Sequence, residues 1–230
     1  MTRYIKRHSL QARITHGIFA ISCILLAISG LFVFVPALAA SVPSQITFII
    51  RMAHRVLGII FILAPIISGI MAPGGVVHIW KMYVTKWDHD DKLWLLKFIP
   101  YMLASKKVHM PDQHEVKSGQ RIADGALIFG AVAISVSGVF LLLGTTIVEL
   151  SAGLMIVMRL VHDIAFLWLC VFGLAHIFLG AGIFQPYRGT VRLMFGDGKV
   201  SESDALYHWG YWAREELESG KNVVIEENDK

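Results

Sequence analysis

Four histidines lie inside the strongly apolar stretches of this sequence, and their side chains are the groups best suited to chemistry there. They are His16, His54, His162 and His176. Imidazole is costly to place in hydrocarbon, so a histidine within a membrane-spanning stretch usually has a function. A neutral imidazole nitrogen is a common metal ligand. The alternative is a set of histidines that only hydrogen-bond neighbouring helices.

The last two of these histidines, His162 and His176, are fourteen residues apart within the apolar stretch 159–185. At 100° per residue, their side chains point within about 40° of each other and lie about 21 Å apart along a helix. The hydrocarbon layer of a membrane is roughly 30 Å thick. This spacing therefore places one imidazole below each membrane surface.

The composition is that of a membrane protein. The chain has 230 residues, of which 55% are hydrophobic and 17% charged, and its mean hydropathy is +0.60. A soluble domain of this length is less apolar. Backbone polar groups in lipid must be satisfied internally, so spanning segments are helices. We predict an all-α membrane protein with one four-helix bundle over residues 1–215 and an acidic, flexible tail over 216–230. The expected spans are 14–35, 52–71, 122–143 and 154–184.

Basic residues predict that both chain termini are cytoplasmic. The N-terminal tail holds four lysines and arginines and the connection 73–121 holds eight, whereas the connection 36–50 has none. Connections rich in lysine and arginine stay on the cytoplasmic side. In this orientation the histidines form two pairs by depth. These pairs are His16 with His176 at the inner surface and His54 with His162 at the outer surface.

Two imidazoles on facing helices supply both axial ligands of a haem b iron, so two pairs predict two haems b. With both axial positions filled, the expected function is electron transfer. Cys23 and Cys170 form no Cys-x-x-Cys or Cys-x-x-Cys-His pattern, which argues against covalent haem, an iron–sulfur cluster or structural zinc. The net charge of +4 is accounted for by topology, and no nucleic-acid motif is present.

Arginines accompany three of the four histidines. Arg13, Arg51 and Arg159 each stand three residues before a histidine. That spacing puts both side chains on one helix face, with the arginine one turn nearer the surface. Guanidinium groups there suit the propionates of a haem, and Arg55 is a further candidate at the outer side. The alternative is that these arginines extend to lipid phosphates.

Several motifs resemble the gamma subunit of membrane-bound formate dehydrogenase, a four-helix, di-haem cytochrome b. The resemblance extends from about residue 13 to about residue 215. The motifs are Arg13-Ile-Thr-His16, Ser29-Gly30, Arg51-Met-Ala-His54, Ser118-Gly119-Gln120-Arg121 and the two histidines fourteen residues apart. This chain departs from the family pattern at Gly17, where tryptophan is common, and at Lys117, where asparagine is common.

The resemblance implies the same ligand pairs and also a menaquinone or ubiquinone site beside the inner haem. The quinone residues would be Lys117, Ser118, Gly119 and Gln120. Protons would come from the cytoplasm through Lys117 or Asp124. The implied partners are an iron–sulfur subunit and a molybdenum or tungsten catalytic subunit in a bacterial inner membrane. Electrons would then pass from the outer haem to the inner haem and on to quinone.

Two alternatives to this reading remain open. Within the same class, the chain is the cytochrome b of a nickel–iron hydrogenase or of another quinone-reactive oxidoreductase. In another class, it is a haem-free membrane anchor or transporter. The spans carry no paired acidic residues at mid-depth and no inverted repeat of broken helices, which are the usual marks of a transporter.

Overall fold

The computed structural model describes residues 2–182 and 187–226. The chain divides into two compact units. One, which we call the membrane unit, comprises Thr15–Met71 and Gly125–Ala175. The other, which we call the terminal unit, comprises Met1–Ile14, Ala72–Asp124 and His176–Lys230.

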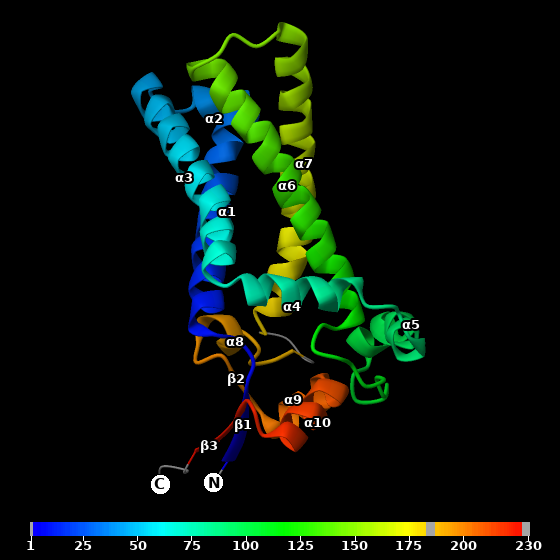
Figure 1. The fold of residues 1–230 in the computed structure, drawn as a ribbon. Helices are drawn as coiled ribbons and strands as arrows, with labels where there is room; N and C mark the ends of the chain where they lie inside the picture. Colours follow the sequence, from blue (N-terminus) through cyan, green and yellow to red (C-terminus); the bar gives the residue numbers. More distant parts are fainter. Residues whose placement is uncertain (1, 183–186, 227–230) are drawn as a thin grey trace. The chain divides into compact units, whose positions relative to one another are not determined.

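Four of the described helices are long and apolar enough to cross a membrane, as expected (Figure 1). They are α1 (Leu10–Phe34), α3 (Ser44–Met71), α6 (Ser118–Thr146) and α7 (Ala152–Gly180). All four begin before the predicted span, because a helix keeps its backbone hydrogen bonds beyond the edge of the apolar run. The fourth ends at Gly180. The last residues of the expected span 154–184 lie outside the described part of the chain.

Within the membrane unit, α1 packs against α3. The rings of Phe19 and Phe61 stack with their centroids 4.1 Å apart. One end of this helix pair carries a polar contact, in which the Thr15 hydroxyl donates to Ser68 Oγ at 2.9 Å. A hydroxyl that is paired between helices avoids the cost of an unsatisfied polar group in an apolar environment.

Helices α6 and α7 pack closely at a glycine. A Cβ atom on Gly130 would lie 2.7 Å from the Trp168 ring and 2.9 Å from Leu169, so only glycine lets the helices approach this far. The Trp168 indole N–H donates to the Ala126 carbonyl at 2.8 Å. Helix α7 also reaches α1, where the rings of Phe34 and Phe166 lie 5.8 Å apart.

The terminal unit contains a small antiparallel sheet that the all-α expectation did not include. Its strand order is β2-β1-β3, formed by β1 (Thr2–Lys6), β2 (Lys199–Ser201) and β3 (Val223–Glu226). Two short helices, α9 (Glu202–His208) and α10 (Gly210–Ser219), complete it. A shared core holds Ile5, Leu193, Val200, Ala205, Trp209, Trp212 and Ala213.

The expectation of a flexible tail over 216–230 is wrong for its described part. Helix α10 continues to Ser219, and β3 pairs with β1 in the register Tyr4 to Val224. The acidic composition predicted disorder because such segments bury little apolar surface alone. Here the strand obtains its hydrogen bonds from the N-terminus of the chain, which no local sequence signal reveals.

The connection between the second and third spans forms two helices, α4 (Pro73–Val84) and α5 (His89–Leu103). Asp88 caps α5 by accepting from the Asp91 backbone N–H at 2.7 Å, and the Asp91 side chain completes the capping box. The remaining short helices are α2 (Pro36–Ala40) and α8 (Arg192–Phe195).

Candidate functional site

The membrane unit brings together the two histidines that the sequence paired at the outer surface. His54 on α3 and His162 on α7 have ring centroids 6.4 Å apart, with their planes at 69°. Both rings are partly buried between apolar helices. This juxtaposition is the geometric core of the candidate site.

Each of these imidazoles meets a serine through its Nδ1 atom. Ser29 Oγ on α1 lies 2.8 Å from His54 Nδ1, and Ser137 Oγ on α6 lies 3.1 Å from His162 Nδ1. Both serines are buried. With Nδ1 engaged on each ring, Nε2 is the nitrogen that remains for a ligand.

Glycine follows each serine and lets the imidazole approach the helix. A Cβ atom on Gly138 would lie 3.3 Å from His162 Cε1, and one on Gly30 would lie 3.5 Å from His54 Cε1. The first distance is tighter than nearly all real Cβ contacts. The Ser-Gly pairs therefore seat both rings against their neighbouring helices.

The separation of the two rings fits bis-histidine ligation of one metal. An imidazole nitrogen binds a metal at about 2 Å, which places each ring centre about 3 Å from the metal. Two rings on opposite sides of one iron then have centres about 6 Å apart. The observed 6.4 Å agrees with this. A haem b iron with these two ligands has no free axial position.

The predicted inner pair, His16 and His176, is divided between the two units. His16 lies in the membrane unit and His176 in the terminal unit, and both are partly buried. Their pairing therefore stays a prediction from depth and resemblance.

The four arginines predicted to hold propionates differ in their surroundings. Arg13 donates to the Gly196 carbonyl within the terminal unit. Arg51 and Arg159 are exposed, and Arg55 is partly buried. Arg51 also lines a surface hollow of about 470 Å³ at the N-terminal end of α3. Arg51 and Arg159 are accessible to an anionic group, whereas the Arg13 guanidinium already has a carbonyl partner.

A comparison with known families adds an independent finding. Residues 7–197 match the family model of prokaryotic cytochrome b561. The chain belongs to the prokaryotic cytochrome b561 family. It is therefore a multi-pass membrane cytochrome of the b type, which binds haem b and takes part in electron transfer. No curated protein matches the chain.

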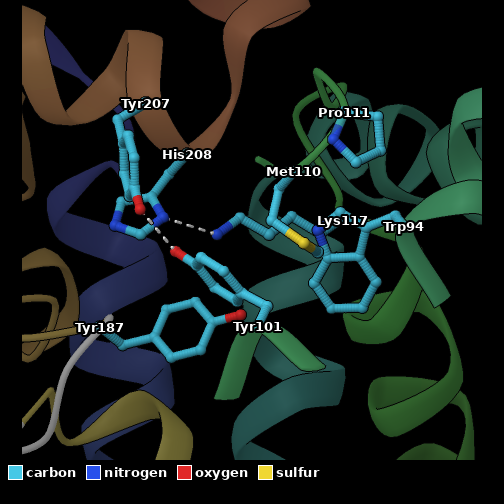
Figure 2. Close-up of a pocket in the computed structure, with 8 residues that line it drawn as sticks. All are labelled: Trp94, Tyr101, Met110, Pro111, Lys117, Tyr187, Tyr207 and His208. Atoms are coloured by element: carbon cyan, nitrogen blue, oxygen red, sulfur yellow. Dashed lines mark hydrogen bonds between the residues drawn. The ribbon is translucent and has the colours of Figure 1, made fainter. Parts of the chain in front are cut away.

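This cytochrome b561 family member also has a cluster of cationic and aromatic side chains in its terminal unit, which we call the Lys117 cluster; Figure 2 shows its members Lys117, Tyr187 and His208. It comprises Arg7, Lys117, Tyr187, His208 and Trp209. Lys117 is only 7% exposed, and its Nζ lies 3.1 Å from His208 Nδ1. The ammonium also lies over the rings of Trp209 and Tyr187, at 4.5 and 4.8 Å from their centroids.

The charges of this cluster are poorly compensated. Burial and the neighbouring charge of Arg7 hold the pKa of Lys117 well below its usual value. Burial, with the charges of Lys117 and Arg7, lowers the pKa of His208 to about 3, so this imidazole is neutral. Burial also lowers the pKa of Arg7 to about 10, which Glu115 partly offsets. Perturbed groups of this kind concentrate at functional sites.

A small cavity of about 10 Å³ adjoins Lys117 and His208, which is room for one water molecule. Figure 2 shows Tyr101 and Tyr207 at its edge, where the Tyr101 hydroxyl donates to the Tyr207 hydroxyl at 3.0 Å. Polar groups with exchangeable protons thus surround the buried ammonium.

The other three predicted quinone residues follow Lys117 at the start of α6, and two of them pack closely against neighbouring segments. Ser118 is fully buried, and its Oγ contacts Asp91 Oδ1 at 2.7 Å and Gln113 Oε1 at 2.8 Å. Gly119 packs directly against Trp94, because a Cβ atom there would lie 2.4 Å from the indole ring. Ser118 thus contacts both α5 and the loop before α6, and Gly119 packs against α5.

Gln120 and Asp124 form a hydrogen-bonded group with a third residue, Tyr83, which the sequence did not indicate. The Gln120 amide donates to Asp124 Oδ2 at 3.2 Å, and the Tyr83 hydroxyl on α4 donates to the same oxygen. Burial and this carboxylate raise the pKa of Tyr83. The two candidate proton carriers, Lys117 and Asp124, therefore have separate hydrogen-bond partners.

Sequence reasoning missed Arg7, Tyr83 and His208 as members of these clusters. His208 contacts a lysine 91 residues away, and Tyr83 contacts an aspartate 41 residues away. No helical or strand period connects residues so distant. Ser137, by contrast, had a usable signal, since Ser137-Gly138 repeats the Ser29-Gly30 motif.

Proposed function

We propose that this chain is the membrane-embedded electron-transfer subunit of a formate dehydrogenase complex, with two haems b and a quinone site at the cytoplasmic side of a bacterial inner membrane. Haem b, when bound, takes up and releases one electron at a time. The chain would link an iron–sulfur partner subunit at the outer surface to quinone at the inner surface.

The observation that carries this proposal is the geometry of His54 and His162. Their rings lie 6.4 Å apart, and each Nδ1 contacts a serine, which leaves both Nε2 atoms for an iron. His16 and His176 would hold the second haem. Arg51, Arg55 and Arg159 would serve the propionates of the outer haem, and Arg13 is the corresponding candidate at the inner one.

The Lys117 cluster supports a quinone site near the start of α6. Reduction of a quinone consumes two protons, so the site needs a proton donor connected to water. A buried lysine beside a neutral imidazole and a second cation costs stability, which its contacts with two aromatic rings offset only in part. Such a residue is more easily explained by function than by packing. In the proposal, Lys117 and Gln120 contact quinone, while Ser118 and Gly119 hold them in place.

The family match is equally compatible with a second electron donor, a nickel–iron hydrogenase. The partners are proposed to be an iron–sulfur subunit and a molybdenum or tungsten catalytic subunit, on the resemblance of the motifs around His16, His54 and Lys117. A hydrogenase would replace only these partners and would leave the residues of this chain with the same roles.

Two measurements on membranes that contain the intact complex test the proposal. Formate should reduce the cytochrome, giving a reduced-minus-oxidised spectrum with the alpha band of b-type haem, and haem extraction should give two haems per chain. Reduction by hydrogen and not by formate would replace the proposed donor with a hydrogenase. The absence of any b-type alpha band would instead favour a haem-free anchor or transporter.

A further inference from the structure

The two serines that contact the outer histidines share one local geometry. The Ser29 hydroxyl donates to the carbonyl of Leu25 at 2.8 Å, one helical turn earlier. The Ser137 hydroxyl donates to the carbonyl of Ala133 at 2.7 Å in the same way. A hydroxyl has a single hydrogen, so each Oγ can only accept from the imidazole it faces. When the serine hydroxyls donate to these carbonyls, the ring hydrogens of His54 and His162 lie on Nδ1 and donate to Ser29 and Ser137.

The same arrangement occurs twice in the sequence at a constant offset. Ser29-Gly30 and His54 recur as Ser137-Gly138 and His162, each 108 residues later, and Arg51 recurs as Arg159. The two helical hairpins, α1 with α3 and α6 with α7, thus carry equivalent Ser-Gly and Arg-x-x-His elements. An incidental contact would not be expected at both equivalent positions.

We infer that Ser29 and Ser137 are positioning residues for the outer haem, which fix the tautomer of its two ligands and tune its reduction potential. This inference rests on the proposed haem ligation by His54 and His162. An acceptor at Nδ1–H directs Nε2 toward the metal and increases electron donation by the ring. Greater donation stabilises ferric over ferrous iron. A serine hydroxyl that donates to its own helix presents its oxygen as an acceptor to the imidazole.

Alanine substitutions test this inference in the intact complex. Ser29→Ala and Ser137→Ala each remove one acceptor. Each should raise the midpoint potential of one haem and weaken its retention about 10- to 100-fold. A tenfold loss of preference for the ferric state corresponds to a rise of about 59 mV for a one-electron couple.

Ser22→Ala is the matched control. Ser22 is buried on α1 and donates to the Ile18 carbonyl at 2.8 Å, as Ser29 does to Leu25, and its hydroxyl contacts carbonyls of its own helix and no histidine among the described residues. This variant should leave both potentials and the low-spin electron paramagnetic resonance signals unchanged. Threonine at 29 or 137 keeps the hydroxyl and should restore the wild-type potential, which separates loss of the acceptor from a packing defect.

The possible outcomes are distinct. Haem retained in Ser29→Ala and Ser137→Ala with unchanged potentials and resonance signals would overturn the positioning role while leaving haem ligation intact. Equal shifts in Ser22→Ala would also overturn it, because the effect would then be general to helix packing. Wild-type protein without b-type haem would instead overturn the proposed function.

Discussion

At the scale of one residue, Lys117 is a buried cation with little compensation for its charge. Its ammonium is 7% exposed and has a neutral hydrogen-bond partner, His208, while the nearby charge of Arg7 is of the same sign. The rings of Trp209 and Tyr187 next to it compensate only part of the desolvation. Burial and the charge of Arg7 thus lower the pKa of Lys117 and favour loss of its proton.

Replacement of Lys117 by methionine should slow quinone reduction at least tenfold, because a general acid typically contributes about 10²- to 10⁴-fold. The b-type haem spectrum should not change. The measurement is formate-driven reduction of a quinone analogue, with reduction of a soluble dye by the catalytic partner as the reference. Lys107→Met, at an exposed lysine of the same connection, is the control. Equal rates in the two variants would remove Lys117 from the quinone site.

His208 predicts a specific pH dependence of stability. Its pKa is about 3 in the folded protein against 6.5 ordinarily, so its stabilising effect is complete above pH 6.5 and decreases as the pH falls toward 3. Between pH 6.5 and 5 the loss is about 2 kcal/mol of unfolding free energy. Thermal unfolding followed by tryptophan fluorescence of Trp209 and Trp212 measures it. His208→Gln keeps an acceptor for Lys117 and cannot titrate, so its midpoint should fall less on acidification. Identical pH profiles would contradict this assignment.

At the scale of elements, the start of α6 is fixed by contacts with α5. Asp91 completes the capping box of α5, contacts Ser118 and forms an ion pair with Arg121 at 3.4 Å between two buried side chains. Trp94, one turn further along α5, covers Gly119. These contacts hold the predicted quinone residues in one place, although the residues themselves belong to a chain segment that follows a long loop.

Gly119→Ala should destabilise the terminal unit by about 1–3 kcal/mol, the usual cost of overpacking. The added Cβ would lie 2.4 Å from the Trp94 ring. Trp94→Phe shortens that ring and should recover part of the loss in the double variant, as a double-mutant cycle would show. Gly125→Ala, also on α6, meets nothing within 4 Å and should be neutral or slightly stabilising. Equal destabilisation by the two alanines would point to helix effects and not to the Trp94 contact.

At the scale of the whole molecule, α7 is the helix that contributes a histidine to each proposed haem. His162 faces His54 in the membrane unit, and His176 lies fourteen residues further along the same helix. A continuous helix keeps a fixed distance between the two ligands, about 21 Å along its axis. The chain thereby sets the separation of the two proposed redox centres by helix length alone.

Substitution of each α7 histidine should therefore interrupt electron transfer at a different step. His176→Ala should remove the inner haem and stop quinone reduction, while the partner enzyme still reduces a soluble dye and the outer haem. His162→Ala should prevent reduction of the remaining haem by formate, yet quinol should still reduce it from the other side. Haem stoichiometry and the two reduction assays distinguish these results. Unchanged quinol formation in His176→Ala would contradict the predicted inner ligand.

The sequence by itself determined the four spans, the two histidines fourteen residues apart and the outer pair, because helix period and hydropathy are local properties. The repeat of Ser29-Gly30 as Ser137-Gly138 was also present in it. Only the tertiary structure decided that each serine lies within hydrogen-bond distance of a histidine, that Lys117 lies against His208, and that β3 pairs with β1. These contacts join residues 25 to over 200 positions apart, and their partners are selected by the packing of whole elements, which no local period encodes.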